Sequence, residues 1–312
     1  MLKLIEHNLS SETQELLTQI QTFLANKQKD IDQKVGFEEQ KNRAITLWDG
    51  KKNSKEGKTV FATIKKALNE MSEGFEVCQY CEHDRNRDIE HIYPKSFFPN
   101  KTFCWENYLL VCPNCNLEKS NKLYVHVNNG SKAVSIKDLS PPYSEDIAFI
   151  NPRREDPSEL IYLSFDDFLF YSAFPPQSRF YEKVEKTLEV LALNDSFKTS
   201  SRENAFVSYK RFLVEYVAIK NAMDFDSLNK ATDGIPPLDE SADFQFQKQN
   251  LLTHHRQNLN GRENLSVLKE MLRRRDYLPS QRLKNLIDQV PELYSLLSIP
   301  EALPNNVTYA KQ

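Results

Sequence analysis

Glycine is scarce in this sequence, with seven among 312 residues, and long apolar runs are absent. No stretch approaches the ~18 consecutive apolar residues of a membrane-spanning helix, so we expect no membrane span. The segment GKKNSKEGKT at residues 50–59 ends like a phosphate-binding loop. However, six residues separate Gly50 from Gly57, more than that motif allows. We therefore interpret residues 50–59 as a basic loop between helices and expect no nucleotide site in this chain.

An excess of positive charge is also lacking, because 41 lysines and arginines face 44 acidic residues and the net charge is −3. Sequence-independent binding of nucleic acid needs a basic footprint, so it would require local charge or a partner protein. The local candidates are Lys95, Lys101, Lys119, Lys122, Arg153–Arg154 and Arg273–Arg275, the last of which would also suit a helix C-terminus. The N-terminus, MLKLIEHNLSSETQELL, lacks the apolar core and cleavage site of a signal peptide, so we expect a cytoplasmic protein.

Cysteine is rare as well, but four of the five form two CxxC pairs, Cys78–Cys81 and Cys112–Cys115. Two such pairs can complete a tetrahedral zinc site, and a cytoplasmic chain would keep the thiols reduced, which disfavours a disulfide or a redox motif. The 30 residues between the pairs exceed the usual ~15–20, which indicates a folded segment inside the gap. We expect Cys104 to be a small buried residue beside Trp105, and His83 is a possible substitute ligand.

The segment between and after these pairs carries a carboxylate beside a histidine in DIEHIYP, and then Asn116 in CNLEKSNK. The Glu90 carboxylate and the Asn116 carbonyl are oxygen ligands suited to Mg²⁺ or Mn²⁺, and His91 could remove a proton from an attacking water. Lys119 and Lys122 would then be placed for phosphate contacts. Asn116 is alternatively a helix N-cap. The residues therefore predict a metal-dependent phosphodiesterase.

The arrangement of Glu90–His91, Asn107 and Asn116 between CxxC pairs resembles the HNH (ββα-metal) endonucleases. The resemblance implies that His91 is the general base, that Glu90 and Asn116 hold the catalytic metal, and that Asn107 orients the loop of the histidine. Many members have Asp where this chain has Glu90, which makes Asp88 a possible additional metal ligand.

Longer blocks, from VCQYCE through WENYLLVCPNCNLEKSNK and NPRREDP to TLEVLALN and Arg202, resemble the PtuB-type nucleases over roughly residues 60–205. That family belongs to Septu anti-phage systems, including those attached to retrons. The resemblance implies an SMC-like ABC ATPase of the PtuA type as partner, and possible association with a retron reverse transcriptase and its RNA–DNA element.

Elsewhere the patterns are helical. Leu16, Ile20 and Phe23 form one face after a Ser11–Gln14 capping box, and a second apolar face follows in TVFATIKKALNEM. Further helices are predicted in YEKVEKTLEVLAL, in the segment capped by Ser200, in RENLSVLKEMLRRR and in SQRLKNLIDQV; FDDFLFY at residues 165–171 is either strand or core.

We predict a mainly α protein, with helical N-terminal (1–75) and C-terminal (136–312) regions around a small zinc-pinned ββα-metal HNH core at residues 76–135. The predicted function is hydrolysis of nucleic acid, with DNA favoured and RNA second. The alternative is a catalytically silent nucleic-acid-binding or adaptor subunit.

Overall fold

The computed structural model forms two compact units, residues 1–162 with 170–195, and residues 163–169 with 196–297. None of the helices described is long and apolar enough to cross a bilayer. The structure describes residues 1, 3–5, 9–33, 35–72, 76–85, 88–128, 130–234, 236–259, 262–297 and 299.

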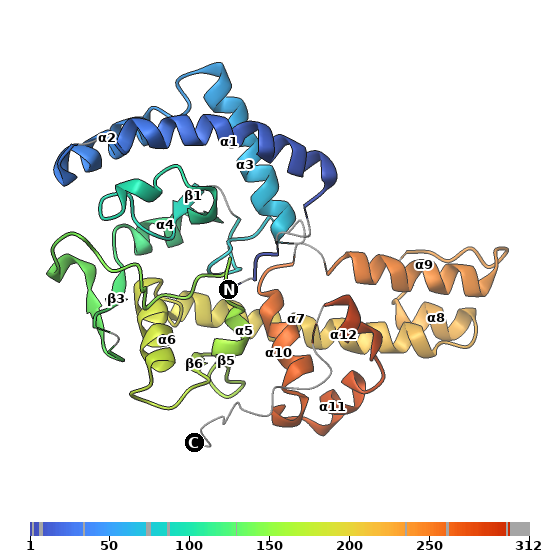
Figure 1. The fold of residues 1–312 in the computed structure, drawn as a ribbon. Helices are drawn as coiled ribbons and strands as arrows, with labels where there is room; N and C mark the ends of the chain where they lie inside the picture. The colour runs from blue at the N-terminus through green and yellow to red at the C-terminus, as the bar shows by residue number, and fades with distance from the viewer. Residues whose placement is uncertain are drawn as a thin grey trace. The chain divides into compact units, whose positions relative to one another are not determined.

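The first unit begins with three helices, α1 (Ser11–Ile31), α2 (Phe37–Asp49) and α3 (Lys55–Met71). Helix α1 packs against both α2 and α3 (Figure 1). The Ser54 side chain caps α3 by accepting a hydrogen bond from the Gly57 amide. The apolar face predicted for α3 is confirmed, since each of its four residues is buried: Val60, Ile64, Leu68 and Met71.

Helix α1 differs from its prediction in register. Its N-cap is Ser10, whose side chain accepts from the Thr13 amide, so Ser11 is the first helical residue and not the cap. Leu16 and Phe23 are half-buried. The buried stripe is rotated from the predicted one and consists of Thr13, Leu17, Ile20, Leu24 and Ile31.

The rest of the first unit alternates short strands with short helices, and each of its sheets has two strands. Strand β1 pairs antiparallel with β2, and β3 pairs antiparallel with β4. Of the aromatic run at 165–171, residues 165–169 lie between β5 and β6, and Phe170 and Tyr171 belong to β6. The elements are β1 (Asp88–His91), β2 (Tyr108–Val111), α4 (Pro113–Lys119), β3 (Tyr124–His126), β4 (Ala133–Ser135), α5 (Pro157–Leu160), β5 (Ile161–Leu163), β6 (Phe170–Ser172) and α6 (Arg179–Val190).

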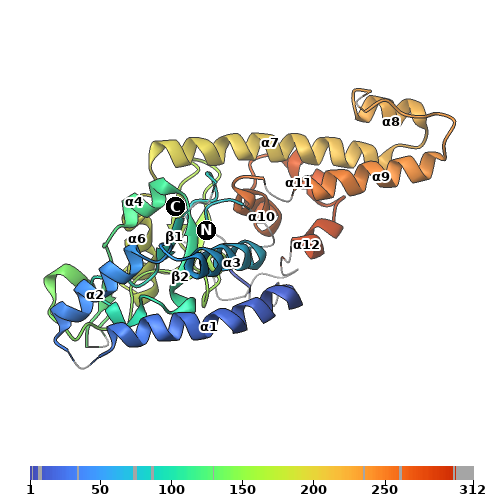
Figure 2. The ribbon, with the colours of Figure 1, turned by 90° about the horizontal axis from the view of Figure 1, so that it is seen from above.

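The second unit is helical and is organised along α7 (Ser196–Asn221), with α9 (Phe244–Gln257) beside it (Figure 2). Ser200, predicted as a cap, lies inside α7 because the helix begins four residues earlier. The buried face of α7 includes Tyr209, Leu213 and Tyr216. The remaining helices are α8 (Phe225–Ala231), α10 (Leu265–Arg273), α11 (Gln281–Ile287) and α12 (Glu292–Leu296). The protein is therefore mainly α with small sheets, as predicted.

Candidate active site

Strands β1 and β2 and helix α4 follow one another as a ββα unit. In the β1–β2 ladder, Glu90 lies opposite Leu109 and His91 opposite Tyr108. Strand β2 leads into α4, whose first residue, Pro113, has no N–H group to leave unpaired at a helix start. The N-cap of α4 is Cys112, so the alternative role of Asn116 as an N-cap is excluded. The unit thus carries cysteine, acidic, histidine and asparagine side chains on adjacent elements.

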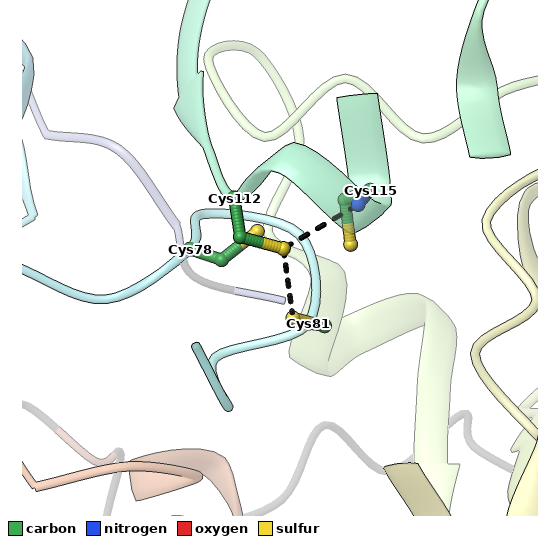
Figure 3. Close-up of side chains that lie close together, drawn as sticks. All are labelled: Cys78, Cys81, Cys112 and Cys115. Atoms are coloured by element: carbon green, nitrogen blue, oxygen red, sulfur yellow. Dashed lines mark hydrogen bonds between the residues drawn. The ribbon is translucent and has the colours of Figure 1, made fainter. Parts of the chain in front are cut away.

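The four CxxC cysteines converge at the start of α4, and their sulfurs all lie within 4.8 Å of one another (Figure 3). Zinc–sulfur bonds of about 2.3 Å in a tetrahedron place the sulfurs about 3.8 Å apart. The Sγ atoms of Cys81 and Cys112 are 3.9 Å apart, which fits zinc and is far too long for a disulfide. The residues that would hold the ion are therefore Cys78, Cys81, Cys112 and Cys115.

The groups around this cluster favour the thiolate form of Cys81 and Cys112. The Cys115 amide, in the first turn of α4, points at the Cys112 sulfur from 3.4 Å (Figure 3). Hydrogen bonds from the neighbouring thiols, that of Cys112 first, lower the pKa of Cys81, whereas burial raises the pKa of Cys78. The fifth cysteine, Cys104, is half-buried outside the cluster, and its thiol points at the Asn100 carbonyl.

His91 ends β1, and the residue is 4% exposed. The imidazole packs against the indole of Trp48 in α2, with ring centroids 4.1 Å apart, and against Tyr108 at 5.4 Å. The His91 Nε2 atom lies 2.9 Å from the Thr102 carbonyl oxygen. Since a carbonyl can only accept, Nε2 carries the proton and Nδ1 keeps its lone pair. Burial lowers the pKa of His91 to about 3, so the ring is neutral near pH 7.

The carboxylates of β1 have separate partners on α4. Glu90 accepts a hydrogen bond of 2.9 Å from the ammonium of Lys119, which is fully buried and also donates to the His91 carbonyl at 2.7 Å. Asp88 accepts from the Asn116 side-chain amide at 3.0 Å. In the structure, therefore, Asn116 is hydrogen-bonded to Asp88. Lys119, which the sequence suggested as a phosphate contact, instead forms an ion pair with Glu90.

Asn107 closes the loop between the strands. Its side-chain oxygen accepts from the Tyr93 amide at 2.7 Å, and its side-chain nitrogen donates to the carbonyls of Tyr93 and Lys101 at 3.0 and 2.9 Å. The residue after Lys101 is Thr102, whose carbonyl receives the His91 hydrogen bond. Asn107 thus fixes the backbone that sets the orientation of the His91 ring.

A catalytic cation would find its oxygen donors at Glu90, Asp88 and Asn116. The Lys119 ammonium binds one Glu90 oxygen, so the other is available, and the Asn116 carbonyl is available because its amide nitrogen faces Asp88. Carboxylate and amide oxygens are the donors that Mg²⁺ and Mn²⁺ prefer. The donor set fits such an ion, although the nearby Lys119 charge opposes its binding.

Two contributors to this site were not predicted from the sequence: Trp48 of α2 and Lys51 of the loop that follows α2. The Lys51 ammonium lies 4.2 Å from the centroid of the Trp48 ring and donates to the Trp48 carbonyl at 3.1 Å. The available signal was weak, since α2 buries just Ala44 and Trp48, one helical turn apart. Their proximity to His91 is a long-range contact that no local spacing reveals.

Comparison with known proteins places the ββα unit in a family. Residues 78–122 match the HNH endonuclease family. The Septu protein PtuB of Bacillus thuringiensis is 39% identical over 61 residues, which are 18% of this chain and 23% of that protein. The match therefore spans less than a quarter of the relative's length. No solved structure matches the chain. Residues 78–122 form an HNH endonuclease domain, and across this region the chain resembles Septu protein PtuB.

Proposed function

We propose that the chain is a metal-dependent endonuclease that hydrolyses phosphodiester bonds of nucleic acid. The observation that carries the proposal is the HNH domain at residues 78–122, folded as a ββα unit with a four-cysteine cluster at its end. Four residues would perform the work, and each lies in or beside this unit: Glu90, His91, Asn107 and Asn116.

In this proposal His91 is the general base. Its Nδ1 lone pair accepts the proton of the attacking water, and the Nε2 hydrogen bond to Thr102 fixes the tautomer. Asn107 is a positioning residue, because it holds the loop that presents the Thr102 carbonyl. The neutral ring is the form that can take up a proton.

Glu90 and Asn116 would hold Mg²⁺ or Mn²⁺, with Asp88 as a possible further ligand. When bound, the cation supplies positive charge that stabilises the developing negative charge of the phosphodiester and the leaving oxygen. Lys119 would then share the Glu90 carboxylate with the ion, and its second hydrogen bond, to the His91 carbonyl, would keep the end of β1 in place.

A second candidate function is a catalytically silent nucleic-acid-binding or adaptor subunit. It is favoured by the 4% exposure of His91 and by the Lys119 ammonium on Glu90, since both groups are engaged by the protein itself. A general base must reach its water, so this reading predicts that replacing His91 changes stability and leaves nucleic acid intact.

We further propose DNA as the first substrate and RNA as the second, and a role in anti-phage defence, by the resemblance to Septu protein PtuB. The resemblance also suggests an SMC-like ABC ATPase of the PtuA type as the controlling partner, and possible attachment to a retron reverse transcriptase with its RNA–DNA element. Co-purification of the chain with proteins expressed from neighbouring genes tests these partners.

The deciding experiment is cleavage of a panel of DNA and RNA by the full chain, alone and with the ATPase, in MgCl₂ or MnCl₂. The variant His91→Ala should lose cleavage by ~10²–10⁴-fold. His126→Ala is the matched control, since it removes another buried imidazole of the same unit, 1% exposed. Cleavage that survives in His91→Ala contradicts the proposal, and cleavage of neither polymer by the folded parent protein favours the adaptor.

A further inference from the structure

Most of the cations expected to bind phosphate are already paired. Lys119 is buried on Glu90, and Lys101 lies 2.9 Å from the Glu145 carboxylate. The Arg153 guanidinium stacks on Trp105, 4.4 Å from the ring centroid. With a net charge of −3, the chain repels a polyanion unless other positive groups face the site. The question is therefore which other cations lie near the ββα unit.

The basic loop between α2 and α3 provides two of them, and it is shorter than expected: it covers residues 50–54, because residues 55–59 form the start of α3. The loop is held in one conformation, because Ser54 caps α3 and the Lys51 backbone carbonyl lies against Gly57. A Cβ atom at position 57 would lie 2.0 Å from that carbonyl oxygen, so only glycine allows the approach. The loop thus presents Lys51 and Lys52 from a fixed backbone.

This loop faces the candidate general base. The Lys51 ammonium lies 4.2 Å from the centroid of the Trp48 ring, and the same indole contacts the His91 imidazole, 4.1 Å away between centroids. Half-buried Lys51 and His91 therefore contact the same aromatic ring. The same ammonium is 6.0 Å from the Phe61 ring, which anchors it on α3.

Two further lysines approach the same place from other elements. Burial, followed by the charges of Lys52 and Lys95, lowers the pKa of Lys51 to about 8, and the carboxylates of Asp49 and Asp88 act in the opposite sense. The pKa of Lys65 in α3 is lowered by burial and then by Lys52. These interactions couple Lys51 to Lys52 and Lys95, and Lys65 to Lys52, while Asp88 of β1 acts on both Lys51 and Lys65. Within the described residues, Lys52 and Lys95 make no hydrogen bond or ion pair.

We propose, on the basis of the proposed function, that Lys51, Lys52, Lys65 and Lys95 form a phosphate-binding surface for the sugar–phosphate backbone beside the scissile bond. A polyanion would relieve the repulsion among these ammonium groups, which the carboxylates of Asp49 and Asp88 offset in part. Lysine binds phosphate as a point charge, so the surface reads no sequence. It would supply the local positive charge that the composition lacks.

The test is binding of a fluorescein-labelled DNA duplex by the full chain, followed by anisotropy over a series of NaCl concentrations. The first variant is Lys52→Gln with Lys95→Gln, because neither side chain holds the described structure together. The slope of log K against log salt should fall in magnitude by about 2, with equal weakening for duplexes of unrelated sequence. Adding Lys51→Gln and Lys65→Gln should extend the loss, with circular dichroism and zinc content as checks on folding.

The matched control is Lys29→Gln with Lys137→Gln, which removes two exposed lysines of the same unit outside the cluster. It should keep the parent slope. An unchanged slope in the first variant, an equal change in the control, or no duplex binding by the parent chain overturns the proposal. If cleavage depends on His91 while the salt slope of the first variant is unchanged, the proposed phosphate-binding surface is wrong and the proposed nuclease activity is supported. If cleavage persists in His91→Ala, the nuclease assignment fails, and the slope still decides the surface.

Discussion

The indole of Trp48 lies edge to face with the imidazole of His91, with centroids 4.1 Å apart and planes inclined by 63°. The two residues are 43 positions apart in the sequence and belong to a helix and a strand of the same unit. Trp48 is 6% exposed and also contacts the rings of Phe61 and Tyr108. The candidate base is therefore held by an aromatic cluster that the N-terminal helices complete.

Replacing Trp48 tests whether this ring holds the base or blocks it. Trp48→Ala should lower the free energy of unfolding by about 3–5 kcal/mol, as the loss of a large buried aromatic does, measured by chemical denaturation. Cleavage assayed below the variant's melting temperature should also fall, because His91 loses one wall of its pocket. The other tryptophan, half-buried Trp105, gives the control Trp105→Ala, which should cost less stability. Faster cleavage by Trp48→Ala would instead identify the indole as a cover over the base.

Zinc binding by the four-cysteine cluster is testable without any cleavage assay. The purified chain should contain one zinc, and Cys112→Ser should abolish it, because Cys112 contributes a sulfur ligand and also caps α4. A strong chelator should unfold the ββα unit, since the binding free energy of such sites is folding free energy. Metal content by mass spectrometry and circular dichroism measure the two effects. Cys104→Ser is the control, and zinc loss in that variant would contradict the assignment.

The cysteine cluster and the face of α3 could be predicted from sequence because each depends on spacing within a short segment. Each CxxC pair is a local motif, and the two pairs form a metal site once they come together. Val60, Ile64 and Leu68 repeat with the helical period. Helix starts were less accurate: Ser10 caps α1 and α7 begins at Ser196, because serines occur in runs at both places and each could cap.

The environment of the site residues could not be predicted in the same way. That Lys119 is buried on Glu90, and that Trp48 covers His91, follows from packing between elements distant in sequence. A lysine in a basic, polar segment is usually exposed, so nothing local indicated an ammonium with no solvent contact. The roles of Glu90, His91 and Asn116 in catalysis stay predictions that the proposed variants address.

In the second unit, a buried carboxyl should make stability depend on pH. Burial raises the pKa of Glu270 to about 7, against the opposing charges of Arg273 and Arg274. The folded state therefore binds this proton more tightly than the unfolded state. The resulting stability is fully present below about pH 4.5 and is lost as the pH rises through about 7, by up to about 3 kcal/mol.

Glu270→Gln should remove this part of the pH dependence, measured as the difference in unfolding free energy from the parent. Glu203→Gln, at an exposed position of α7, is the control, and parallel curves for parent and Glu270→Gln would contradict the prediction.

The contribution of the buried Lys119–Glu90 ion pair to the stability of the ββα unit can be measured. Lys119→Met should lower the free energy of unfolding by about 3–5 kcal/mol, because it leaves a carboxylate of 8% exposure unpaired and removes a donor from the His91 carbonyl. Glu90→Gln in the same chain should restore part of that loss, since the unpaired charge is then gone, and the coupling energy from the double-mutant cycle measures the pair.

The control is Lys122→Met. The Lys122 ammonium lies 3.8 Å from Glu118 at an exposed position, so this variant should change the free energy of unfolding by less than about 1 kcal/mol. Equal losses from Lys119→Met and Lys122→Met would show that the buried pair does not exist in solution. If an added divalent cation restores stability to Lys119→Met but not to the double variant, the ion takes the place of the ammonium at Glu90, which is the behaviour expected of a metal-binding carboxylate.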